Sequence, residues 1–142
     1  MCNELPLAQQ INHAIIEFYE RLSSWEQSVV RGQGVSLAQI HTVEILGANG
    51  AMRMKALADK LGITTGTLTV QIDRLVKNGL VIRQPSSYDR RAVEVLLTPK
   101  GQQMFAEHDE LHLQLTREMT AHFDDSEREQ LLGFLTRING TF

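Results

Sequence analysis

The apolar positions of this chain repeat with helical spacing along much of its length. From residue 7 they recur three or four residues apart, as on one face of a long helix, at Leu7, Ile11, Ile15, Phe18, Leu22, Trp25 and Val29. The glycine-containing segment 31–34 interrupts this pattern. Ser36 and Gln39 then form a capping box, which predicts a second helix through Leu46.

Two shorter helices are predicted next. The first covers 54–61 and ends at Gly62, which reaches a positive φ easily. Thr64 can cap the second, which ends at 78–79. Its expected buried stripe consists of Leu68, Ile72, Leu75 and Val76.

The pattern then changes from helical to extended. Segments 80–83 and 92–97 are rich in β-branched residues, and the turn-forming segment 85–89 separates them. We therefore expect a β-hairpin.

Two more helices complete the pattern. Thr98 caps the first, with Pro99 at its first position, and this helix can run to about Phe123. Ser126 and Glu129 predict a capping box for the last helix. The apolar positions of that helix are Leu131, Leu132, Phe134, Leu135 and Ile138.

This order of elements predicts a mainly α fold with a small β-hairpin wing, a winged helix-turn-helix between long terminal helices. We divide it into an N-terminal dimerisation helix (1–35), a DNA-binding region (36–100) and C-terminal dimerisation helices (101–142), within one compact chain.

Composition fits a globular chain. The 142 residues are 42% hydrophobic, with no apolar run of membrane-spanning length and no visible secretory signal. The single cysteine, Cys2, cannot form an internal disulfide. We expect a soluble, cytoplasmic protein with no membrane partner.

Charge is unevenly distributed. The net charge is -3, yet nine basic and four acidic residues lie between Arg53 and Lys100, a local balance of +5. The flanks carry the remaining five basic and thirteen acidic residues, a balance of -8. A basic middle segment is typical of a DNA-contacting module, although a solvated surface can give the same sum.

The helix after Thr64 is the candidate recognition helix. Small hydroxyls and a glycine permit close approach to DNA, while Gln71 and Arg74 are long enough to reach adenine or guanine edges. The predicted DNA-binding set on this helix is Thr64, Thr65, Gly66, Thr67, Thr69, Gln71 and Arg74. The alternative is that these threonines are only solvated.

The predicted hairpin tip adds Asp89, Arg90 and Arg91. An arginine there can enter a minor groove, whose negative potential attracts it. Asp89 would brace a neighbouring arginine rather than contact DNA, because phosphate repels a carboxylate. An exposed ion pair of little energetic value is the alternative.

At the predicted wing an Asp and an Arg precede a hydrophobic strand that ends in Leu-Thr, and a glycine then opens the next helix: Asp89, Arg91, Val95, Leu97, Thr98 and Gly101. Together with segments 57–62 and 75–81, these residues resemble the MarR family of bacterial transcriptional regulators. The resemblance implies a dimer whose terminal helices interlock, and the apolar faces of those helices support this independently. A homodimer predicts a pseudo-palindromic double-stranded operator with half-sites roughly 10 bp apart.

The resemblance also implies an effector, either a small organic ligand or a metal ion. His108 and His112 lie four residues apart on one helix face, a spacing that suits chelation of one ion. Similarity to the zinc-sensing branch adds His41 and, as the carboxylate, Glu26. The predicted zinc ligands are therefore Glu26, His41, His108 and His112.

Three alternatives remain. The histidines can be hydrogen-bonded structural residues, in which case an organic ligand is the effector. The winged helix can instead be a protein-interaction module that has lost DNA contact. A metal-dependent hydrolase is disfavoured, because the chain has no phosphate-binding glycine loop and no nucleophile motif. We predict a transcriptional repressor, not an enzyme.

Overall fold

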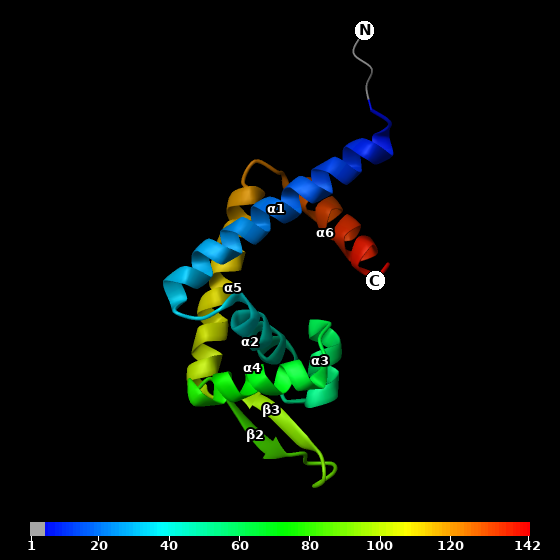
Figure 1. The fold of residues 1–142 in the computed structure, drawn as a ribbon. Helices are drawn as coiled ribbons and strands as arrows, with labels where there is room; N and C mark the ends of the chain where they lie inside the picture. The colour runs from blue at the N-terminus through cyan, green and yellow to red at the C-terminus, as the bar shows by residue number, and fades with distance from the viewer. Residues whose placement is uncertain (1–4) are drawn as a thin grey trace. The chain divides into compact units, whose positions relative to one another are not determined.

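The computed structural model describes residues 5–142, so the prediction attached to Cys2 lies outside the described residues. The chain forms two compact units, which divide between Gln102 and Gln103. Figure 1 labels the helices and the strands β2 and β3. The predicted division into segments 1–35, 36–100 and 101–142 stays a prediction.

The first two helices begin where the sequence pattern places them. Helix α1 spans Leu7–Gln33 and ends at Gly34, whose φ of 72° is left-handed. Helix α2 spans Leu37–Asn49, three residues longer than predicted. The Ser36–Gln39 capping box is present in both directions, so this prediction is confirmed.

The helix-turn-helix also follows the prediction. Helix α3 spans Met54–Leu61, and Gly62 ends it with φ 67°. Helix α4 spans Thr65–Lys77, with Thr64 as its N-cap. These caps satisfy backbone groups locally, which is why the sequence alone could place them.

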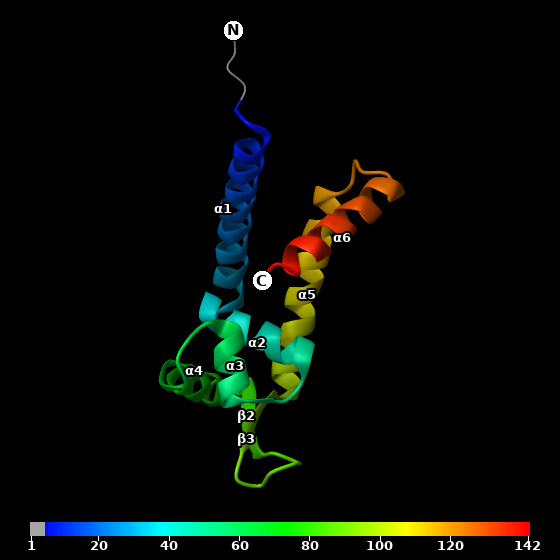
Figure 2. The ribbon, with the colours of Figure 1, turned by 90° about the vertical axis from the view of Figure 1, so that its right-hand side faces the viewer.

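The hairpin belongs to a larger sheet than predicted. Strands β2 (Val81–Pro85) and β3 (Val93–Leu97) pair antiparallel, as expected. A short strand, β1 (Met52–Arg53), pairs with the other edge of β3 and gives the order β1-β3-β2. Figure 2 shows the β2–β3 hairpin extending beyond helices α3 and α4.

The core of the first unit joins its helices to the sheet. Its fully buried apolar side chains come from α2, α3, α4, the turn before β2 and the strands, and include Ile40, Val43, Leu46, Leu57, Leu68, Ile72, Leu75, Leu80, Val81 and Val95. Val76 is 38% exposed, so its predicted place in the buried stripe was wrong. It lies about 100° around the helix axis from Leu75, on the flank of the stripe.

The last helices differ from the prediction at their ends. Helix α5 spans Pro99–Met119 and stops before Phe123. Helix α6 spans Asp125–Asn139. Its capping box uses Asp124 and Glu127, so the predicted Ser126–Glu129 box was wrong. The two candidate boxes overlap in sequence, and the aspartate two residues earlier is an equally good cap.

Thr98 is the link between the turn after α4 and the start of α5. Its hydroxyl donates a hydrogen bond to the carbonyl oxygen of Gly79, at 2.6 Å, and accepts one from the backbone N–H of Gly101, at 3.1 Å. Thr98 therefore fixes the end of β3 against the start of β2.

Among residues 5–142, no helix has both the length and the apolar character needed to cross a bilayer.

Candidate nucleic-acid interface

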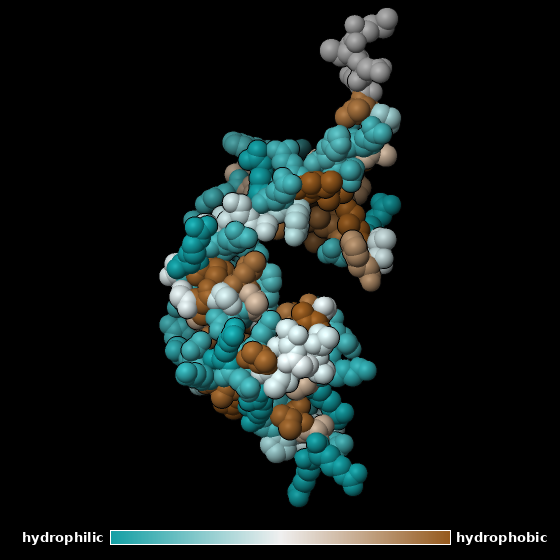
Figure 3. Space-filling view, viewed as in Figure 1, coloured by the Kyte–Doolittle hydropathy of each residue, from teal (hydrophilic) through white to brown (hydrophobic). Residues whose placement is uncertain are grey.

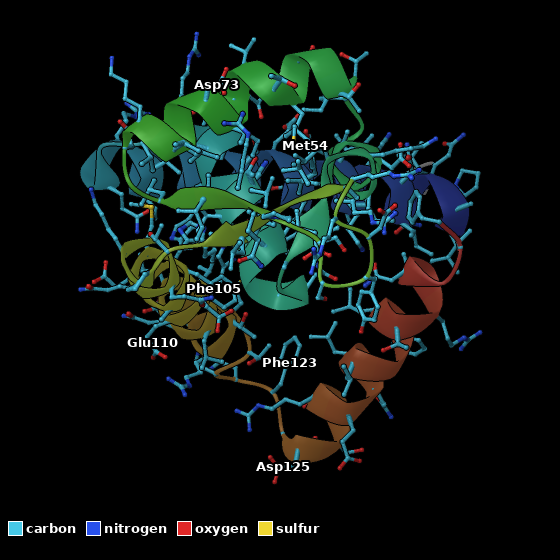
Figure 4. All side chains as sticks on the ribbon, turned by 90° about the horizontal axis from the view of Figure 1, so that it is seen from below. Met54, Asp73, Phe105, Glu110, Phe123 and Asp125 are labelled. Carbon is cyan, nitrogen blue, oxygen red and sulfur yellow. The ribbon has the colours of Figure 1, made fainter. Side chains whose placement is uncertain are left out.

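The orientation of α4 follows from its buried stripe. Leu68, Ile72 and Leu75 are completely buried, so the opposite side of the helix faces outward. Figure 4 shows side chains projecting from α4 away from the strands, with Asp73 labelled on this helix. This is the geometry that a recognition helix requires.

The structure places the predicted recognition residues on α4 and its N-terminal end. All are exposed except Gln71, which is half-buried: the exposed ones are Thr64, Thr65, Gly66, Thr67, Thr69 and Arg74. The Thr64 hydroxyl accepts a hydrogen bond from the backbone N–H of Thr67, at 3.2 Å. The N-terminus of α4 is therefore ordered and accessible. DNA contact by this set stays a prediction.

The hairpin tip is held by its own backbone and short side chains. The Ser86 N–H donates to the Ala92 carbonyl oxygen at 2.8 Å, and the Ala92 N–H donates to the Asp89 carbonyl oxygen at 3.0 Å. Ser86 is only 3% exposed, and its hydroxyl accepts from the N–H of Tyr88. The tip is therefore an ordered turn.

Asp89 was expected to brace a neighbouring arginine side chain, and the structure shows a different contact. Its carboxylate accepts a hydrogen bond from the backbone N–H of Arg91, at 3.0 Å, rather than from an arginine side chain. This contact fixes the backbone on which Arg90 and Arg91 stand, and both arginines are exposed. Figure 3 shows hydrophilic surface at the hairpin tip.

An ion pair that the sequence analysis missed joins α4 to the wing. Arg83 of β2 donates a hydrogen bond from its guanidinium to the carboxylate of Asp73 on α4. The two residues are ten positions apart across a turn, so no helical or strand spacing pointed to the pair. The contact ties the candidate recognition helix to the strand that carries the wing.

The histidine pair lies on α5 in the second unit. The Nε2 atoms of His108 and His112 are 3.1 Å apart, and His108 is fully buried. On the same helix, Phe105 and Leu115 are half-buried, whereas Met119 is 44% exposed. The predicted i, i+4 approach of the two rings is therefore present.

The other predicted ligands lie close together in the first unit. Nε2 of His41 on α2 is 3.2 Å from Oε2 of Glu26 on α1. Glu44, which the sequence analysis missed, places a carboxylate oxygen within 4.8 Å of one from Glu26. Its position three residues after His41 on α2 was the available signal. Metal binding by any of these residues stays a prediction.

The chain is similar in sequence and in fold to transcriptional regulators. The MarR family model matches residues 35–93. The transcriptional regulator FarR of Neisseria gonorrhoeae is 30% identical over 97 residues, which cover 68% of this chain and 66% of FarR. A putative regulator for the hcr operon of Thauera aromatica is 24% identical over 112 residues, 79% of this chain and 68% of that protein.

Solved structures confirm the fold. FabT of Streptococcus pneumoniae, crystallised in complex with DNA, superposes with a TM-score of 0.83 at 23% identity over 94% of this chain and 96% of FabT. The predicted winged helix-turn-helix class is therefore confirmed. The chain spans about half to two thirds of the length of several of the curated relatives it matches, among them FarR and the hcr operon regulator.

These relatives are regulators and not enzymes, which confirms the prediction of a non-enzymatic protein. The family model covers the helix-turn-helix and most of the wing, the segment that carries the predicted interface. Together with the shared fold, it places this chain in the MarR family of winged-helix transcriptional regulators.

Proposed function

We propose that this protein is a dimeric repressor that binds a specific double-stranded operator. The observation that carries the proposal is the joined pair of elements in the first unit. An outward-facing α4 is tied by the Asp73–Arg83 ion pair to a hairpin with two exposed arginines at its tip. A helix of this kind enters a major groove while the hairpin reaches the adjacent minor groove.

Exposed apolar side chains on the terminal helices support a homodimer. On α1 they are Leu7, Ile11, Ile15, Ile16, Phe18 and Tyr19. On and just beyond α6 they are Leu132, Phe134, Leu135, Ile138 and Phe142, and Figure 3 shows this hydrophobic surface over α6. Contiguous exposed apolar surface marks an interaction site, and twofold pairing is the commonest arrangement that covers one.

The first test is DNA binding as a function of salt. A duplex selected by the protein from a random library is expected to bind with a logarithm of affinity that falls linearly with the logarithm of salt concentration, because phosphate neutralisation releases counterions. Fluorescence anisotropy with the selected duplex and a scrambled duplex of the same composition measures both affinity and specificity.

Two results would contradict the proposal. Failure to enrich any duplex favours the alternative of a protein-interaction winged helix. If sedimentation shows a monomer at the concentrations used for binding, the proposed twofold operator is contradicted, because one α4 reads only one half-site.

We further propose that the effector is a divalent metal ion, with zinc as the best match. Two nitrogens bound to one tetrahedral zinc lie roughly 3.3 Å apart, given bond lengths of about 2.0–2.1 Å. The 3.1 Å between the Nε2 atoms of His108 and His112 fits that spacing. His108 and His112 would supply two imidazole nitrogens to the ion. In the first unit, the predicted ligands Glu26 and His41, together with Glu44, offer further oxygen and nitrogen atoms of the kind that zinc prefers.

Replacing the histidine pair tests this proposal. His108→Ala with His112→Ala is expected to abolish any effect of micromolar zinc on operator affinity and to lower bound zinc to the background level. Metal analysis of tag-free protein and duplex titrations with and without zinc measure the two effects. His112→Gln, at a half-buried position, repeats the test if the double variant is unstable, and His122→Ala at an exposed position is the control.

The competing interpretation of the same geometry is a hydrogen bond between the two rings. A protein that holds no zinc after equilibration with micromolar zinc, and whose operator affinity zinc leaves unchanged, supports that interpretation. An organic effector then becomes the remaining candidate.

A further inference from the structure

The outward face of α4 carries an apolar side chain near its centre. Val70 lies two residues from both Leu68 and Ile72, which places it about 200° around the helix axis from the buried stripe. It is 53% exposed, whereas Leu68 and Ile72 are fully buried. Core packing does not explain a β-branched apolar residue at this position.

The neighbours of Val70 leave room for a partner. One helical turn earlier, Gly66 has no side chain, and a Cβ added there would meet only the Thr64 hydroxyl, at 3.9 Å. One turn later stands Arg74, an exposed cation suited to a phosphate or a guanine edge. The Asp73 carboxylate is paired with Arg83, which reduces its repulsion of a nucleic acid.

Hydroxyl groups beside Val70 are engaged within the helix. The Thr69 hydroxyl donates to the carbonyl oxygen of Thr65 at 2.8 Å, and the Thr64 hydroxyl donates to the hydroxyl oxygen of Thr67 at 3.0 Å. These protons are therefore committed to intrahelical acceptors and not to base edges. At Val70 the outward face therefore offers apolar contact, and the adjacent Thr69 hydroxyl supplies no free donor beside it.

We propose that Val70 contacts the C5-methyl group of a thymine in the major groove of each half-site. That methyl group distinguishes T·A from the other base pairs in the major groove and pairs well with apolar side chains. Val70 would thus select thymine at one position of the operator. The inference rests on the proposed operator binding and adds a specificity-determining residue to it.

Deoxyuridine supplies a sharp probe, because it differs from thymidine only by lacking the methyl group. The test begins with the duplex that the wild-type protein selects from a random library. Each thymine is then replaced by deoxyuridine, one symmetric pair of positions at a time. Wild-type protein, Val70→Ala and Val76→Ala are titrated with every duplex at the same salt concentration.

Wild-type protein should lose affinity at one symmetric pair of positions by about fourfold per half-site, or about fifteenfold overall, the effect of one buried methyl group. Val70→Ala should bind the thymine and deoxyuridine duplexes at that pair equally within twofold. Val76→Ala removes the same atoms from the flank of α4, so it should keep the wild-type sensitivity. Because both valines are partly exposed, all three proteins should melt at similar temperatures.

The outcomes separate the two proposals. If no duplex is enriched, operator binding and this inference both fail. If a duplex binds specifically but Val70→Ala keeps the full deoxyuridine penalty, or no thymine shows one, only the role of Val70 is overturned. The role of Val70 is also overturned if Val76→Ala removes the deoxyuridine penalty as fully as Val70→Ala does, because the effect is then not localised to the centre of the helix face.

Discussion

Replacing both wing arginines, as Arg90→Ala with Arg91→Ala, is expected to weaken operator binding by about a hundredfold or more while leaving the fold intact. Each groove-reaching arginine contributes about 1–3 kcal/mol, and a dimer carries two such tips. Both side chains are exposed, and the Ser86, Asp89 and Ala92 hydrogen bonds hold the turn without them. Anisotropy titrations with the selected duplex at moderate salt measure the loss.

The matched control removes the same two charges elsewhere. Arg21 and Arg117 form exposed ion pairs with Glu17 and Glu110 on α1 and α5, and such pairs contribute little stability. Arg21→Ala with Arg117→Ala should change affinity only slightly. Equal losses in the two double variants would show that net charge, and not the wing, determines binding.

Gly101→Ala is expected to lower the free energy of unfolding by about 3 kcal/mol or more, because backbone must move to admit one methyl group. A Cβ at this buried position would lie 2.1 Å from the carbonyl oxygen of Leu80 and 3.2 Å from Cβ of Leu97. The Gly101 N–H also donates to the Thr98 hydroxyl, so a shift would weaken that link. Urea denaturation followed by circular dichroism measures the change.

Gly32→Ala is the matched control for this substitution. Gly32 lies inside α1, and a Cβ added there meets no heavy atom within 4 Å. Alanine at that position should leave stability unchanged or raise it by up to about 1 kcal/mol, because alanine favours the helix. Equal stabilities of wild type and Gly101→Ala would show that the backbone of Leu80 does not approach α5 as closely as the structure indicates.

Local rules account for the parts of the fold that the sequence predicted well. The Ser36–Gln39 box, the Thr64 cap and the glycine ends at Gly34 and Gly62 each involve residues within a few positions of one another. The same is true of the i, i+4 approach of the two histidines on α5. Where two local signals overlapped, as at Asp124 and Ser126, sequence alone could not choose between them.

Local sequence rules could not predict contacts between positions that are distant in the sequence. The Asp73–Arg83 pair depends on how α4 lies against β2. The lack of space for a Cβ at Gly101 depends on where the carbonyl oxygen of Leu80 lies. The exposure of Val70 was implicit in the helical period, but its proposed role also depends on the hydrogen bond that engages the adjacent Thr69 hydroxyl within the helix.

The amino-acid sequence by itself determined the helices, the hairpin and the basic middle segment, and it predicted which residues contact DNA, because periodicity, capping and charge are properties of neighbouring residues. The tertiary structure alone decided that β1 joins the sheet, that Asp89 orders the wing backbone, and that Asp73 and Arg83 connect helix to wing. Those contacts depend on chain packing, which brings together groups that no sequence interval relates.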